Sequence, residues 1–177
     1  MGEIKSTLDL VMEKTKHLSL SAEEKQNQKK VELEKRMNGL LQKYQDQILS
    51  VEQVHTEYAR LRQELSLPDD SFLINQTMNK IDLTGDNRSL LELLKQFCGS
   101  GIAGIESILN EFQDEYNSAA SYRLVELREE LAAKHSISGS AVVPNLQADE
   151  AWQAEAAEIR SRYNQRLAGE RVILENR

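Results

Sequence analysis

A glycine-rich segment at residues 99–104 is the first feature of this sequence that could support chemistry. It reads Gly-Ser-Gly-Ile-Ala-Gly, the spacing that lets a pyrophosphate approach a helix N-terminus in dinucleotide-binding folds. That use requires a strand before the glycines and an acidic residue about 20 positions later. Here residues 90–97 have a helical pattern, and the acidic residue, Glu126, lies within an expected long helix. We therefore interpret the segment as a turn between two helices, with a contact of small residues, and expect no cofactor.

A glutamate and a histidine three residues apart, Glu52 and His55, form a second candidate. Di-iron helical bundles use two such pairs together with two further glutamates from other helices. This sequence holds one pair, and its other histidines, His17 and His135, lack the spacing. Glu52 and His55 also flank the apolar positions of their helix, so we interpret them as a polar surface pair and expect no metal site.

The single cysteine, Cys98, comes just before an expected helix N-terminus, a position that can lower a thiol pKa and make the group reactive. No His or Asp lies near it in the sequence, so we interpret it as a small buried residue. The acidic segment 82–93 resembles a calcium loop but has Asn87 and Leu93 where that loop needs Gly and Glu. With no Ser-His-Asp set, P-loop or HExxH motif, we predict no catalytic residues and a protein that is not an enzyme.

Charge argues against a nucleic-acid partner. The chain of 177 residues has 22 Lys+Arg against 29 Asp+Glu, a net charge of −7, whereas phosphate binding is driven by basic residues. One basic cluster stands near its C-terminus, at Arg160, Arg162, Arg166 and Arg171. Glutamates are interleaved with these arginines, which indicates a solvated helix face with i,i+4 pairs.

Long helices must position all of these residues. Ser21 and Glu24 form a capping box, and no proline follows until Pro68. The spacing therefore predicts a helix over 22–65, about 65 Å long at 1.5 Å per residue. If it is broken, Gly39 or the Leu49-Ser50 step is where we expect the break.

Ten residues of this helix follow an alternating spacing of four and three, and nine of them are apolar: Leu33, Met37, Leu40, Tyr44, Gln47, Val51, Val54, Tyr58, Leu61 and Leu65. A 3.5-residue period sustained over four heptads is typical of a coiled coil. We predict that this series is an interaction seam. It could pack against the helix expected at 101–134, or pair with its copy in a second chain, where Gln47 would set the register as a buried polar layer. Both can coexist, and we expect a homo-oligomer, with a dimer favoured.

The rest of the chain predicts further helices: short ones at 71–81 and 88–97, a long one at 101–134, and a last one starting near Asp149 as N-cap. The last helix has an apolar stripe of Trp152, Ala156, Ile159, Tyr163 and Leu167. The sequence thus predicts an all-α single domain, 1–177, of long antiparallel helices in coiled-coil-like or helical-bundle packing, with short helices at one end. Its parts are 1–67, 68–100, 101–135, a loop at 136–148, and 149–177.

The opening residues 3–16, EIKSTLDLVMEKTK, resemble the start of a family of short, helical, uncharacterised bacterial proteins. That family has no assigned activity, so the resemblance implies a bacterial, cytoplasmic setting and no site residues. A cytoplasmic location also follows from the lack of a signal peptide and of any apolar run near 18 residues.

These patterns predict a non-enzymatic protein–protein interaction or scaffold protein. One alternative is a regulator that binds a small ligand or metal between its helices, with Glu52, His55 and Cys98 as first candidates. Another is a nucleic-acid-associated protein that uses the Arg160–Arg171 face.

Overall fold

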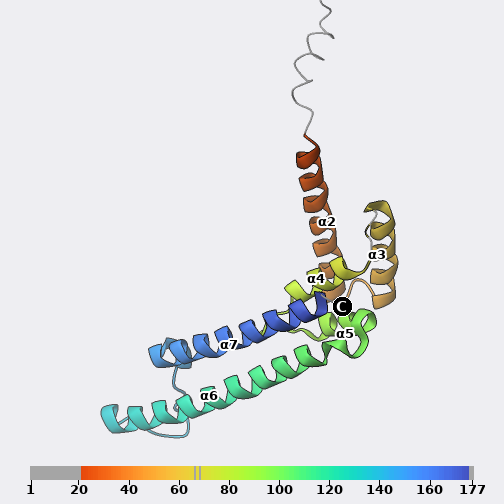
Figure 1. The fold of residues 1–177 in the computed structure, drawn as a ribbon. Coiled ribbons are helices and arrows are strands. Elements are labelled where there is room, and N and C mark those ends of the chain that lie inside the picture. Colours follow the sequence, from red (N-terminus) through yellow and green to blue (C-terminus); the bar gives the residue numbers. More distant parts are fainter. Residues whose placement is uncertain (1–20, 66, 68, 176–177) are drawn as a thin grey trace, which may run out of the picture. The chain divides into compact units, whose positions relative to one another are not determined.

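The computed structural model describes residues 21–65, 67 and 69–175. These residues form helices and turns and no strand, which confirms the all-α prediction (Figure 1). The chain divides into two compact units, Met1–Ser66 and Leu67–Arg177, and the division falls beside Pro68. The opening at 3–16, and a short amphipathic helix that the sequence predicts over 3–17, lie outside the described residues.

The described residues of the first unit, 21–65, form the helices α2 (Ala22–Gln45) and α3 (Val51–Leu65). Ser21 and Glu24 form the predicted capping box at the start of α2: the Glu24 N–H donates to Ser21 Oγ (3.1 Å) and the Ser21 N–H to Glu24 Oε2 (2.7 Å). An ion pair at 3.0 Å between Arg36 and Glu64 connects the two helices. Glu64 lies near the C-terminal end of α3. The part of α2 that precedes this ion pair is exposed at every residue from 23 to 32.

A sharp turn at residues 46–50 separates α2 from α3, so the helix that we expected over 22–65, whose continuity the sequence left open, is broken. Gln47 adopts a left-handed backbone (φ 58°). Its N–H donates to the Tyr44 carbonyl (3.0 Å), and the Ile48 N–H donates to the Lys43 carbonyl (2.9 Å). These two bonds are a Schellman motif, which ends a helix by satisfying its last carbonyls. The break includes the Leu49-Ser50 step that we named, whereas Gly39 lies inside α2.

Ser50 and Gln53 then start α3 with a second capping box. The Gln53 N–H donates to Ser50 Oγ (3.3 Å), and the Ser50 N–H donates to Gln53 Oε1 (2.8 Å). A reciprocal pair of this kind satisfies donors that have no partner inside the helix. The chain therefore stops one helix and begins the next within five residues, using local hydrogen bonds alone.

The second unit contains α4 (Ser71–Asn79), α5 (Arg88–Cys98), α6 (Ala103–His135) and α7 (Glu150–Glu175). Short 3₁₀ turns at Gly99–Ile102 and Leu146–Ala148 lead into α6 and α7. The two long helices lie side by side, joined by the loop after His135 (Figure 1). Among the described helices, none is long and apolar enough to cross a membrane.

The core of this unit draws on all four helices: Met78, Ile81, Leu83, Leu90, Leu94, Ile102, Ile105, Ile108, Phe112, Ile159, Tyr163, Leu167 and Leu174. The stripe predicted for the last helix is buried at every position, from Trp152 to Leu167. These apolar side chains are the main source of stability for the pairing of α6 with α7.

Near the start of α7, aromatic rings and an ion pair hold α6 against α7. The Tyr116 ring meets Trp152 edge-on at 5.1 Å between centroids. Arg123 binds Asp149 through Nε–Oδ1 (2.8 Å) and Nη2–Oδ2 (2.9 Å). Asp149 also accepts the Trp152 N–H at 2.8 Å, which confirms it as the cap of the last helix. One carboxylate thus starts α7 and ties it to α6.

Candidate functional site

The predicted interaction seam is largely buried in the single chain. Leu33, Met37, Leu40, Tyr44, Val54 and Tyr58 are buried, and Val51, Leu61 and Leu65 are half-buried. Gln47 is exposed in the turn between the helices. Its proposed role as a buried register-setting layer is therefore wrong, because the turn removes it from the helical series.

A groove of about 890 Å³ runs along the α2–α3 hairpin. Its apolar lining includes Leu40 and Leu61, and both signs of charge surround it: Lys35, Arg36, Lys43 and Arg60 against Glu32, Glu57 and Glu64. Arg36 binds Glu64 and also Glu32 (2.8 Å). The hydrogen bond that Arg36 donates to Glu64 is the main cause that raises the pKa of Arg36. With four basic and three acidic residues along its lining, the groove has no strong net charge with which to select a ligand.

The glycine-rich segment is a turn between helices, as we interpreted it. Helix α5 precedes it instead of a strand, and Gly99 ends α5 with φ 56° and ψ −128°. Gly104 allows a close approach of α7: a Cβ there would lie 2.5 Å from Glu170 Oε2. A carboxylate occupies the space beside the third glycine of the motif, which leaves no basis for a pyrophosphate at that position.

Glu52 and His55 lie on the exposed side of α3. Ser50 Oγ donates to Glu52 Oε2 at 2.6 Å, and this bond is the main reason that the pKa of Glu52 is lowered. Cys98 belongs to the second unit, where it is half-buried and packs against the core. Within the part of the chain that the structure describes, no three His, Cys, Asp or Glu residues converge on a possible metal position.

Three of the four arginines in the α7 cluster bind across to α6 instead of along their own helix, while Arg171 donates to the Ile81 carbonyl (3.4 Å). Arg162 pairs with Glu115, and Arg166 pairs with Glu111 at 2.7 Å. Arg160 donates to the Tyr116 hydroxyl at 2.9 Å. The i,i+4 pairing that we expected for this cluster is therefore wrong for these three residues, since their partners stand on the neighbouring helix.

Hydroxyl groups contribute most to the ionisation of the two α6 carboxylates. The Tyr163 hydroxyl donates to Glu115 (2.9 Å), and this bond, followed by that from Arg162, lowers the pKa of Glu115. The Ser107 hydroxyl donates to Glu111 (2.7 Å) and, together with Arg166, lowers its pKa. Charged side chains of both helices are thus engaged in holding α6 and α7 together.

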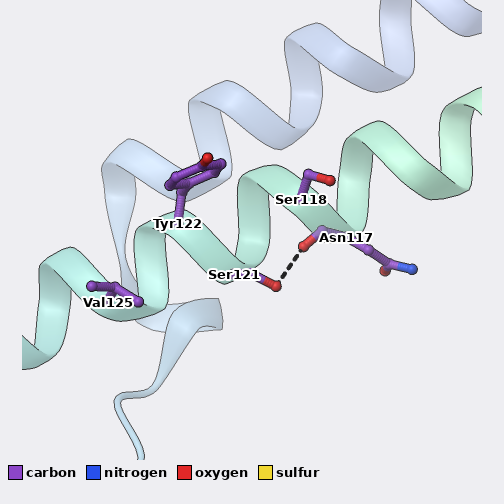
Figure 2. Close-up of a pocket in the computed structure, with 5 residues that line it drawn as sticks. All are labelled: Asn117, Ser118, Ser121, Tyr122 and Val125. Carbon is purple, nitrogen blue, oxygen red and sulfur yellow. Dashed lines mark hydrogen bonds between the residues drawn. The ribbon is translucent and has the colours of Figure 1, made fainter.

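The side of α6 that lies away from the Phe112 ring carries a surface that we call the α6 face. It consists of Asn117, Ser118, Ser121, Tyr122 and Val125. These residues line a shallow hollow of about 400 Å³, and Figure 2 shows them along one stretch of the helix. Tyr122 is 77% exposed and Val125 is 52% exposed. Ser121 Oγ donates to the Asn117 carbonyl (2.8 Å), so its own polarity is satisfied within the helix.

Helix geometry explains why the α6 face is uncovered. Ser121 lies nine residues after Phe112, and about 100° per residue places it on the side of α6 away from that ring. Phe112 packs on Tyr163 of α7, at 5.6 Å between centroids. We did not identify this face from the sequence, because the apolar stripe through Phe112 and Tyr116 is the stronger pattern. The sequence pattern that could have indicated this face is the i, i+3, i+4, i+7 spacing of Ser118, Ser121, Tyr122 and Val125.

Comparison with known proteins gives no relative: no family model, no curated protein and no solved structure matches this chain.

Proposed function

We propose that this protein is a non-enzymatic interaction or scaffold protein that binds partners through exposed faces of its helices. The α6 face carries this proposal, because two large apolar side chains, Tyr122 and Val125, stand exposed and adjacent on one helix. Aromatic and apolar anchors at i, i+3, i+4 and i+7 spacing are how a helix enters the groove of a partner. The setting that we propose is the bacterial cytoplasm, with the protein as a homo-oligomer.

The pairing of α6 with α7 supports the proposal that α6 holds its exposed face in a fixed position for a partner. The helix that bears Tyr122 is held from the other side by stacked rings, by Arg123–Asp149 and by the arginines of α7. A rigid helix loses little conformational freedom when it binds, and this lowers the free-energy cost of association. Among the described residues, no three His, Cys, Asp or Glu side chains converge on a possible metal position, so we rank the metal or ligand regulator lower.

The test is affinity capture from the native host, combined with a mass measurement in solution, for the wild type and two valine variants. Val125→Asp places a charge on the α6 face. Val143→Asp is the matched control, because Val143 is 77% exposed in the loop before α7. We expect association, with itself or with a captured protein, in the wild type and in Val143→Asp, and its loss in Val125→Asp. A monomeric mass and no captured protein for the wild type would refute the proposal.

A further inference from the structure

The α6 face has charges placed symmetrically about its centre. Asp114 lies seven residues before Ser121, and Arg128 lies seven residues after it. Seven residues are nearly two helical turns, so all three stand on the same side of α6. Both charged side chains are exposed. Within the described chain neither Asp114 nor Arg128 forms an ion pair, whereas other charges on α6 are paired, such as Glu111 and Arg123.

We propose that the α6 face is the interface of an antiparallel homodimer, with a two-fold axis near Ser121. This proposal rests on the interaction function proposed above and names its first partner, a second copy of this chain. The two-fold axis places Asp114 of each copy beside Arg128 of the other, so that two ion pairs flank the centre. An interface about a two-fold axis must be complementary to itself, and opposite charges equidistant from the centre have that property.

The middle of the α6 face suits close helix packing. Ser118 and Ser121 are small and let two helix backbones approach, while Val125 and Tyr122 supply apolar surface that water now covers. Asp114, Ser118, Ser121, Val125, Arg128 and Ala132 follow a spacing of four and three. This is the 3.5-residue period of a coiled-coil seam, and here it runs along an exposed side of the helix.

A heterologous partner would not need this symmetry. A face shaped for another protein requires charges complementary to that protein, without any relation between its own two ends. The self-complementary ends of the α6 face therefore favour a second copy over an unrelated helix.

Charge reversal tests the proposal directly. Arg128→Asp places the new carboxylate of one copy opposite Asp114 of the other, and Asp114→Arg places two guanidinium groups together. We expect each variant alone to weaken the dimer about tenfold or more, measured by sedimentation at low salt. The double variant restores the opposite charges and should dimerise as the wild type does. Lys29→Asp is the control, because it changes the net charge by the same amount as Arg128→Asp at an exposed position of α2.

Mixing the two single variants gives the most decisive measurement in this experiment. In a heterodimer of Asp114→Arg with Arg128→Asp, one copy has arginine at both positions and the other has aspartate at both. Each of the two pairs that flank the centre therefore joins an arginine to an aspartate. The mixture should therefore associate about as tightly as the wild type and the double variant, although each component alone dimerises weakly. Recovery in the double variant also shows that neither substitution unfolds the protein. If the double variant stays monomeric, or if each single variant dimerises as tightly as the wild type, the proposal is overturned.

Cysteine cross-linking tests the orientation, in a Cys98→Ala background. Ser121→Cys stands near the proposed axis and should form an intermolecular disulfide readily. Ala132→Cys is on the same side, eleven residues further along, so its two copies would be roughly 30 Å apart in an antiparallel dimer but adjacent in a parallel one. Efficient cross-linking through residue 132, with or without cross-linking through residue 121, would overturn the proposal.

The results also separate this inference from the function on which it rests. A wild type that is monomeric, but whose captured partner is lost in Val125→Asp, would overturn the homodimer and retain the interaction function. A monomer with no captured partner would overturn both.

Discussion

Gly99 and Gly39 show how the surroundings of a single residue decide what it contributes. Gly99 has φ 56° and ψ −128°, a conformation open to glycine and strained for other residues. Gly39 lies inside α2 with open space where a Cβ would stand. We expect Gly99→Ala to lower the free energy of unfolding by about 1–2 kcal/mol. Gly39→Ala should raise it by about 0.5–1 kcal/mol, because alanine loses less backbone entropy in a helix. Denaturant titration of both variants measures the difference, and an equal effect of the two would contradict it.

Asp149 should make stability sensitive to acid. The hydrogen bond that Arg123 donates to Asp149 is the main cause that lowers the pKa of Asp149 from an ordinary 3.8 to about 2. The hydrogen bond from the Trp152 N–H is the next cause. A carboxylate with a lowered folded-state pKa stabilises the fold above its unfolded pKa, and this stabilisation is lost as the pH falls through the folded value. We expect Asp149→Asn to have a lower melting temperature than the wild type at pH 6. The gap should close between about pH 4 and pH 2.

The control for this titration is an aspartate variant elsewhere. Asp86 also has a pKa lowered to about 2, mainly by Arg88 at the start of α5, but it connects no two helices. Asp86→Asn should therefore change the melting temperature less than Asp149→Asn. A gap for Asp149→Asn that persists at about pH 2 would show that charge is not the cause.

At the scale of elements, the helix-breaking and helix-capping residues in the sequence predicted most helices correctly. Pro68, the Gly99–Gly101 pair and the loop around Pro144 each separate helices where we expected boundaries, and Asp149 caps α7. A break at the Leu49-Ser50 step was one of the two that we named, but Gln47 was not identified as its left-handed residue, because Schellman motifs usually have glycine at that position. The S-x-x-Q spacing of Ser50 and Gln53 was a readable sign that a helix begins there.

A substitution at Gln47 distinguishes the turn from a continuous helix, because it should change the stability of the protein in opposite directions in the two cases. In the turn, φ is 58°, so Gln47→Gly should stabilise the protein by roughly 1 kcal/mol, since glycine adopts this conformation without a Cβ clash. In a continuous helix, the same change would destabilise by about 1 kcal/mol. Gln47→Val should be destabilising, because a β-branched residue tolerates positive φ least. Thermal unfolding of the two variants checks this, and a loss of stability in Gln47→Gly would contradict the turn.

At the scale of the whole molecule, the fold class followed from the sequence but the candidate site did not. The heptad series from Leu33 to Leu65 was the strongest pattern, yet most of it is buried in the single chain. A buried stripe and a stripe for a partner obey the same helical period. Only the position of the neighbouring helix shows which is which, so the exposure of Tyr122 and Val125 required the structure.

The two compact units should differ in their ability to fold alone. Every residue of the core cluster lies between Met78 and Leu174, so a fragment of residues 67–177 should retain its helices and unfold cooperatively. A fragment of residues 21–66 has a two-helix hairpin, which is too small to bury much apolar surface and should unfold without a sharp transition. Circular dichroism of both fragments during heating checks this. Cooperative unfolding of the hairpin alone would contradict the expected asymmetry.

The position of Trp152 provides a built-in optical reporter. It is the only tryptophan in the chain, it is 1% exposed, and it touches the ring of Tyr116 beside the Asp149 cap. Tryptophan emission shifts to longer wavelength when water reaches the indole, so the natural fluorescence of the protein follows the junction of α6 and α7 without any attached dye. Loosening of that junction would be visible as a colour change in the emission before the helices themselves are lost.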